Sequence, residues 1–307
     1  MAAFALSDAI QYLKDRGFED SSTRAGRVYL KIANEANKRL HMLGKFDFDK
    51  RYADLSFAGV YSTGTVSVAA GATAVTGSGT TWTAAMTGRY LRMNGESLQY
   101  KVTYSSPTAF TIPAYAGESN LSAVTYQLTD DRQALPANFR DFAWPLTDNR
   151  AVPKLFPRAL ELIKMWRRLF QMAQYPWFYA VEVEDVSNVP TPYMNIWPSL
   201  SEKRVITIPY YKWPADLAAD ADKFDIPTEA EPVLQLFLNA LLARESKDGE
   251  WGNLLAEAEK EGRKALAAFR YSSEDLQRES WSPYSDRPDF DLFRTFPGFA
   301  PGETFGA

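Results

Sequence analysis

The chain has 307 residues, enough for about two domains that each bury a hydrophobic core. Hydrophobic residues make up 46% and charged residues 23%, as in an ordinary globular protein, and the net charge of -4 argues against a generally basic protein that coats nucleic acid. Cysteine is absent and His41 is the one histidine, which excludes disulfides, thiol nucleophiles and zinc sites built from cysteine or clustered histidine, and leaves almost no room for a Ser-His-Asp triad.

The sequence shows no targeting or membrane segment. The first residues lack the basic start and the long apolar run of a signal peptide. The most apolar stretch, residues 232–243, is too short to cross a bilayer. We therefore expect synthesis in the cytoplasm and no membrane partner.

Residues 1–58 are predicted to be helical. Apolar residues recur there at steps of three and four, which gives one stripe on a helix. The residues of this stripe are Ala25, Tyr29, Ile32, Ala33, Ala36, Leu40 and Leu43. His41 lies near the expected end of the helix, where the helix dipole favours a cation.

Residues 59–129 have a different composition, with 13 Thr, 8 Ser and 8 Gly but only five charged residues. Short alternating runs separated by turn signals predict an antiparallel β-sandwich or barrel module. The pair Asn94-Gly95 predicts a type I′ hairpin turn. Trp82 is expected to anchor the core of this module.

Residues 130–270 return to helical patterns, with helices expected over 157–174, 231–244 and 250–270. Residues 178–183 and 204–211 are expected to form strands of one small sheet. The sequence therefore predicts an α+β fold: a helical bundle core made of residues 1–58 and 130–270, interrupted by the inserted β module of residues 59–129, with a small second sheet and an extended C-terminal arm.

The arm, residues 271–307, has its own composition: eight aromatic residues, seven acids and three arginines. Prolines at 283, 288, 297 and 301 favour an extended conformation over a helix. Its aromatic residues cannot order the arm unless it lies on a large surface, either of its own chain or of a partner. We predict that it binds a partner through Trp281, Tyr284, Phe290, Phe293, Phe296, Phe299 and Phe305.

Two groups of charged residues are candidates for chemistry. Paired carboxylates are the one enzymatic option that the composition leaves, and the candidates by residue type are Asp130, Asp131, Asp141, Glu182, Glu184 and Asp185. No motif places any two of them across a substrate, so we predict no catalytic, cofactor or metal site. The second group is expected either to contact DNA phosphates or an acidic partner or, as we favour, to form an exposed helix face; it consists of Lys154, Arg158, Lys164, Arg167 and Arg168.

Three stretches carry a resemblance to a known family. They are the β module from Gly64-Thr65-Val66-Ser67-Val68 to Val124-Thr125-Tyr126, the run Leu135-Pro136-Ala137-Asn138-Phe139-Arg140, and Val205-Ile206-Thr207-Ile208-Pro209-Tyr210-Tyr211 with the two helices that follow. In this order they resemble the head-to-tail adaptor (connector) proteins of tailed bacteriophages, in particular short-tailed ones.

The resemblance implies a non-enzymatic virion protein, made in the host cytoplasm. It implies a homo-oligomeric ring, commonly a dodecamer, that binds the portal protein on one side and a tail or nozzle protein on the other. Double-stranded DNA would pass through the ring during ejection without sequence-specific contact. Two other functions stay open at this point: a carbohydrate-binding or tail-fibre-type virion protein that uses the β module, and a glycosidase that uses a carboxylate pair.

Overall fold

The computed structural model describes residues 4–16, 23–143, 146, 155–170 and 174–267, with the backbone alone at 23–27. By its internal contacts the chain divides into two units, Met1–Arg270 and Tyr271–Ala307. The second unit contains the expected C-terminal arm and lies outside the described residues. The boundaries expected within the first unit stay a prediction.

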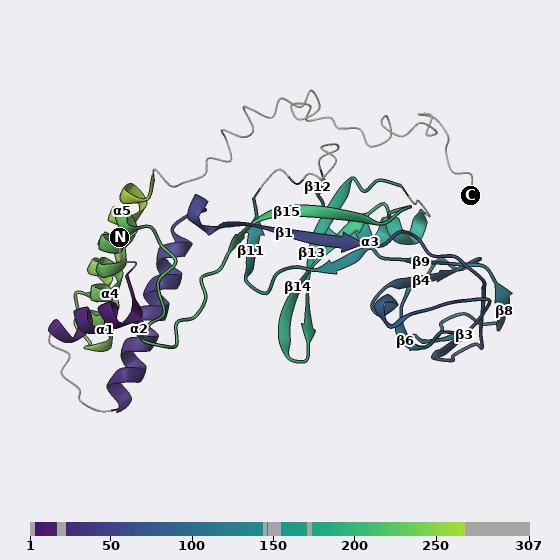
Figure 1. Cartoon of the computed structure of the whole chain (residues 1–307), viewed down its shortest axis with the longest axis horizontal. Coiled ribbons are helices and arrows are strands. Elements are labelled where there is room, and N and C mark those ends of the chain that lie inside the picture. Colours follow the sequence, from purple (N-terminus) through teal and green to yellow (C-terminus); the bar gives the residue numbers. More distant parts are fainter. Residues whose placement is uncertain (1–3, 17–22, 144–145, 147–154, 171–173, 268–307) are drawn as a thin grey trace, which may run out of the picture. The chain divides into compact units, whose positions relative to one another are not determined.

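Strands outnumber helices in the described residues (Figure 1). The α-helices are α1 (Leu6–Asp15), α2 (Thr23–Met42), α3 (Leu160–Leu169), α4 (Glu231–Glu245) and α5 (Trp251–Ala265). The strands up to residue 129 are β1 (Lys50–Phe57), β2 (Thr65–Val68), β3 (Ala74–Ser78), β4 (Tyr90–Met93), β5 (Tyr100–Lys101), β6 (Thr103–Ser106), β7 (Ala109–Thr111), β8 (Leu121–Val124) and β9 (Tyr126–Thr129). The later strands are β10 (Arg132–Ala134), β11 (Phe139–Phe142), β12 (Phe156–Pro157), β13 (Phe178–Val186), β14 (Val189–Trp197) and β15 (Arg204–Lys212).

The prediction of a helical bundle core is wrong, although the fold remains α+β. Helices α1, α2, α4 and α5 share one hydrophobic cluster, but two further clusters lie within and between sheets. The difference begins at β1, a strand that lies within the segment for which the sequence predicts helices. Its apolar residues Leu55 and Phe57 are buried while Asp54 and Ser56 are exposed, and this alternation is the period of a strand.

The helical cluster follows from the stripe on α2. Tyr29, Ile32, Ala33 and Leu40 are all buried, as predicted from their spacing. Helix α2 packs on α4, and α4 packs on α5. Gly262 allows α5 to come close, because a Cβ atom at this position would lie 2.5 Å from Leu43 and 2.8 Å from Val233.

Two of the sheets face each other and share a hydrophobic cluster. One has the strand order β1-β15-β11 and the other β10-β14-β13-β12. Leu55, Ile206 and Ile208 of the first sheet share a buried cluster with Met194 and Ile196 of the second. The two sheets therefore bury one face each, with α3 packed on β13 and β14 of the second sheet.

Strands β13 and β14 form a long hairpin that turns at Ser187 and Asn188. Both turn residues have positive φ angles, 53° and 65°, which is the requirement of a type I′ turn. Strand β10 pairs with β14 only at residues 193–195, and β12 pairs with β13 only at 178–179, so no further strand of the described residues lies beside the hairpin end. Figure 1 shows this end extending past the neighbouring strands.

The expectation that residues 178–183 and 204–211 share a sheet is wrong. Strand β13 belongs to the second sheet and β15 to the first. The pattern concealed β14, which carries Pro190 and Pro192 and so did not resemble a strand. Pro190 pairs only with β13 among the described strands, an edge position that tolerates proline, and Pro192 lies where the pairing with β10 ends, with its main-chain oxygen accepting a hydrogen bond from the Leu135 amide at 2.8 Å.

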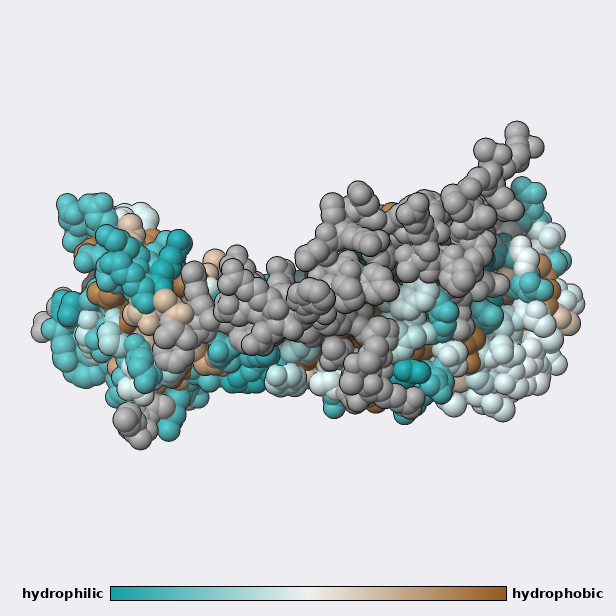
Figure 2. All heavy atoms as spheres, turned by 90° about the horizontal axis from the view of Figure 1, so that it is seen from above, coloured by the Kyte–Doolittle hydropathy of each residue, from teal (hydrophilic) through white to brown (hydrophobic). Residues whose placement is uncertain are grey.

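The β module consists of two antiparallel sheets, with strand orders β6-β7-β3-β2-β8 and β5-β4-β9. Trp82 is buried in its core, as predicted: its ring stacks on Phe110, and its Nε1 donates to the hydroxyl of Tyr126 at 2.9 Å. The type I′ turn predicted at Asn94-Gly95 is wrong, because only Gly95 has a positive φ. Figure 2 shows the surface over this module as largely pale, the colour of residues of intermediate hydropathy such as its many threonines and serines.

Two glycines of α5 provide a test of the close packing of the helices. Gly252→Ala meets no atom within 4 Å and should raise the free energy of unfolding by up to about 1 kcal/mol through helix propensity. Gly262→Ala places the same methyl group against Leu43 and Val233 and should lower the free energy by about 1–3 kcal/mol. Urea unfolding of both variants checks this, and equal effects at the two positions would contradict the packing described here.

Candidate functional site

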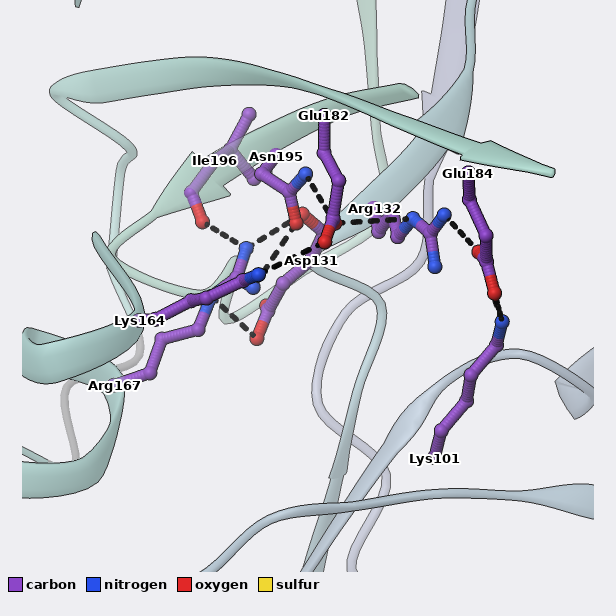
Figure 3. A network of polar contacts seen from close by, with 9 residues as sticks. All are labelled: Lys101, Asp131, Arg132, Lys164, Arg167, Glu182, Glu184, Asn195 and Ile196. Atoms are coloured by element: carbon purple, nitrogen blue, oxygen red, sulfur yellow. Dashed lines mark hydrogen bonds and ion pairs between the residues drawn. The ribbon is translucent and has the colours of Figure 1, made fainter. Parts of the chain in front are cut away.

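A buried arginine is the centre of the polar network where α3 meets the sheet (Figure 3). The side chain of Arg167 is only 4% exposed. Its Nη2 donates to the main-chain oxygens of Asp131 and Ile196, both at 2.9 Å, and its Nη1 donates to Oδ1 of Asn195 at 3.1 Å. The Asp131 carboxylate, fully buried, lies 3.7 Å from the Arg167 Nε and supplies the compensating charge.

Glu182 on β13 extends the network along the hairpin. It accepts hydrogen bonds from Lys164 of α3 at 2.9 Å and from Nδ2 of Asn195 at 3.2 Å. Arg132 of β10 lies 3.7 Å from the same carboxylate. Asn195 thus contacts both Arg167 and Glu182, and it joins the two parts of the network.

Glu184 connects the hairpin to the β module. It lies two residues beyond Glu182 on the same face of β13 and forms an ion pair with Arg132. Lys101 of β5 donates to both of its oxygens, at 2.9 and 3.1 Å. A second contact joins the module to α3, because Nη1 of Arg92 donates to the main-chain oxygen of Arg167 at 3.1 Å.

The charges of the network set the ionisation of its acids. The hydrogen bonds from Lys101 and then Arg132 hold the pKa of Glu184 below its ordinary value. Burial of Glu182 favours its protonated form, but the hydrogen bonds from Lys164 and Asn195 outweigh burial, and the pKa of Glu182 is also lowered. Both carboxylates are therefore charged at neutral pH.

The candidate carboxylates are brought together with cations and not with each other. Asp131, Glu182 and Glu184 are in the network, and Asp141 pairs with Lys45. Asp130 accepts a hydrogen bond from the Ala58 amide at 2.7 Å, and burial raises its pKa. In the described part of the chain, four of the six acids thus contact a cation, while Asp185 is exposed near the hairpin turn.

The exposed-face interpretation of the basic group is wrong for its central member. Arg167 is buried, and Lys164 pairs with Glu182. The guanidinium of Arg158 lies 5.0 Å from the ring centroid of Phe178, while Arg168 is exposed. Lys154 lies outside the described residues. Two of the bases that the sequence singles out, Lys164 and Arg167, are thus partners of two of the acids, Glu182 and Asp131.

Sequence reasoning missed Lys101, Arg132 and Asn195. They are 83, 52 and 13 residues away from their glutamate partners along the chain. The one signal that could have found them is strand register, since Arg132 lies opposite Asn195 in the β10–β14 pair.

His41 lies in the last turn of α2, as predicted. It is fully buried, and its Nδ1 lies 2.7 Å from Oδ1 of Asp49, which is also fully buried. The ring of Phe48 packs edge-on against the imidazole. The main-chain oxygen of His41 accepts a hydrogen bond from Arg140 at 2.6 Å. This pair connects the end of α2 to the start of β1.

Other features bear on the alternative functions. Five aromatic residues of the β module are buried, namely Trp82, Tyr100, Phe110, Tyr115 and Tyr126, and Tyr61, Tyr90 and Tyr104 are partly buried. Within the described ranges, no three His, Asp or Glu side chains come together as a candidate metal site. No helix in the described part of the chain has both the length and the apolar character needed to span a bilayer. The predicted partner-binding residues, Trp281 to Phe305, lie outside the described residues.

A family comparison covers most of the residues that build this network. The profile of the SU10 adaptor protein family matches residues 114–288, more than half of the chain. The chain belongs to the SU10 adaptor protein family. This membership confirms the resemblance to phage adaptors and gives the protein a structural role in the virion, in association with portal and tail components. No curated protein matches the chain.

The buried arginine gives the first test of the network. Arg167→Met leaves the Asp131 carboxylate buried without its partner, and it should lower the free energy of unfolding by about 3–5 kcal/mol. Arg168→Met is the matched control, because the neighbouring side chain is exposed; it should change the free energy by less than about 0.5 kcal/mol. Urea unfolding measures both, and similar losses from the two variants would contradict the assigned role of Arg167.

The lowered pKa of Glu182 predicts an acid-dependent loss of stability. Its contribution is present above the ordinary glutamate value of 4.5 and is lost as the pH falls through the lower pKa of the folded state. Glu182→Gln removes this contribution, so the free energy of unfolding of the variant should fall less steeply below about pH 4.5 than that of the wild type. Urea unfolding over a pH series checks the prediction, and parallel curves would show that Glu182 is not the titrating group.

Proposed function

We propose that this protein is a ring-forming head-to-tail adaptor, in which identical copies join the portal to the tail and surround the channel through which double-stranded DNA leaves. Membership of the SU10 adaptor protein family is the observation that carries the proposal. The structure adds support of two kinds: rigid connections within the chain and two different apolar surfaces.

The rigid connections are the ion network. It joins α3, three strands and the β module. The side chains of its inner members Arg167, Asp131 and Arg132 are buried, whereas Lys101 and Glu184 at the β module are partly exposed. Breaking one member leaves a charge without its partner, which costs far more than breaking an exposed pair. A part that transmits force between capsid and tail benefits from elements that cannot slide independently.

The two apolar surfaces lie on opposite faces of the second sheet. Helix α3 packs on the face of Phe178 and Trp197, and its outer side exposes Leu162, Met165 and Leu169. The opposite face, which is buried at Tyr179 and Met194, continues onto the hairpin end, where Val181 and Val183 are exposed.

A closed ring of identical subunits requires at least two different surfaces on each copy, and each of these apolar surfaces is a candidate for a contact with a neighbouring molecule. Soluble proteins rarely leave contiguous apolar patches exposed unless another molecule covers them.

The charge distribution fits passing DNA. The net charge of -4 is contained in residues 271–307, with seven acids and three arginines, and the rest of the chain is neutral. If these segments contribute to the channel lining, the phosphates meet a negative surface, and DNA slides without being held by lysine or arginine.

Electron microscopy of the negatively stained protein, alone and mixed with portal protein, tests the proposal. We expect rings, in solution or on the portal. A protein that stays monomeric in both samples would overturn the proposal.

A pair of variants tests the hairpin surface within the same experiment. Val183 is 63% exposed, and Val183→Asp places a charge on the apolar surface of the hairpin. This variant should weaken the association between copies by roughly tenfold or more. Met42→Asp is the matched control, since Met42 is also 63% exposed but lies on α2, and it should leave assembly unchanged. Sedimentation velocity over a concentration series measures both, and unchanged assembly of the Val183 variant would exclude the hairpin from the interface.

A further inference from the structure

The outer side of α3 has the features of a peptide-binding surface. Leu162, Met165 and Leu169 lie at i, i+3 and i+7, so they form one stripe along the helix. These side chains are 39%, 43% and 62% exposed. The inner side of the same helix is occupied by Ile163, Trp166 and Arg167, which are buried against the sheet, so the stripe is a second apolar face with no covering element in the described residues.

Positive charge adjoins this stripe. Arg168 is exposed and forms no ion pair within the described ranges. Arg92 also has no carboxylate partner there: its Nε donates to the main-chain oxygen of Glu96 at 3.0 Å and its Nη1 to that of Arg167 at 3.1 Å. Burial lowers its pKa, as expected for a cation without a compensating anion.

The stripe and the charge are continuous. Phe170, which is exposed and directly follows the stripe, also lines a small hollow together with Arg92, Gln99 and Gln127. Arginine and glutamine side chains can donate hydrogen bonds to a carboxylate. The surface therefore suits a ligand that carries aromatic or aliphatic side chains beside carboxylates, in an extended segment.

The chain itself contains a segment of this chemistry. Residues 271–307 combine eight aromatic residues with an excess of four acids over arginines, and the two kinds alternate most densely in Asp289-Phe290-Asp291-Leu292-Phe293. These 37 residues can extend to at most about 130 Å, so their length does not confine them to their own subunit.

We propose that residues 271–307 of one copy bind the outer surface of α3 and the adjoining Arg92 hollow of a second copy. The inference rests on the proposed ring, because a segment given by one subunit and a surface offered by the next make the heterologous contact that a ring requires. Each copy then gives and receives one segment. Such linked contacts reinforce one another, since after the first has formed the others are effectively intramolecular.

Site-specific cross-linking in the full-length protein tests the inference. Phe293 is replaced by p-benzoylphenylalanine, the protein is mixed with an equal amount of an isotope-labelled wild-type copy, and the mixture is irradiated and analysed by mass spectrometry. We expect cross-links from position 293 to residues 158–170 that join a labelled to an unlabelled copy. The same photoreactive residue at Tyr52, which is exposed on β1, should give no cross-links to α3.

Surface variants give a second, independent readout. The double variant Leu162→Asp and Met165→Asp changes only exposed positions, so its thermal unfolding should match the wild type, while the yield of cross-links to α3 should fall at least tenfold. Arg92→Met should lower the yield by a smaller factor. Met42→Asp should leave the yield unchanged.

Imaging the irradiated sample separates the two hypotheses. Rings whose cross-links map away from α3, or only within one copy, overturn this inference and leave the proposed function standing. A yield that survives both aspartates also overturns the inference. A protein that stays monomeric even with portal overturns the proposed function. It also overturns this inference, which requires a second copy. Labelled-to-unlabelled cross-links at α3 that disappear in the double variant support the inference.

Discussion

The structure depends on one buried positive charge. Arg167 cannot be shielded from water without acceptors, and it finds them in the main chain at Asp131 and Ile196 and in the side chain of Asn195. These groups come from β14 and from the segment that leads into β10. These hydrogen bonds form only when α3 lies at one place on the second sheet and β10 and β14 keep one register. The hydrophobic contacts of Trp166 with Phe178 and Trp197 act in the same direction, but they would tolerate small shifts that hydrogen bonds do not.

This placement determines which surfaces remain open. With α3 fixed over one face of the second sheet and the first sheet over the other, the hairpin end and the outer side of α3 are left exposed. Because side chains alternate along β13, one face of this strand carries the glutamates of the network and the other face carries the exposed valines. An adaptor protein needs a rigid interior and surfaces that bind other proteins, and here one arrangement of strands supplies both.

The sequence predicted those features that depend on neighbouring residues. The stripe on α2 and the buried core around Trp82 were predicted, because helical spacing and strand alternation act over a few positions. The helical bundle core was wrong because β1 and β14 have weak local signals. Strand β1 begins with the charged pair Lys50-Arg51, and β14 contains two prolines. The family was recognised from the order of three stretches, not from any single motif.

The network could not be predicted, since its partners are distant in the chain. The carboxylates and the basic residues were both noticed, but Arg167 and Asp131 are 36 positions apart, and Lys101 and Glu184 are 83 apart. Without the register of β10 on β14, nothing indicated that they meet. The same limit explains the misjudged exposure of Arg167, because a charged residue on a helix is exposed unless a specific anion is buried with it.

The network also has a gradient of exposure from its inner to its outer end. Arg167 and Asp131 are shielded from solvent, whereas Lys101 and Glu184 at the β module are both partly open to it. Dissolved ions weaken exposed pairs and barely reach buried ones. The ion pair between Arg167 and Asp131 is therefore insensitive to ionic strength, whereas the ion pair between Lys101 and Glu184, one of the contacts between the hairpin and the β module, weakens as salt rises.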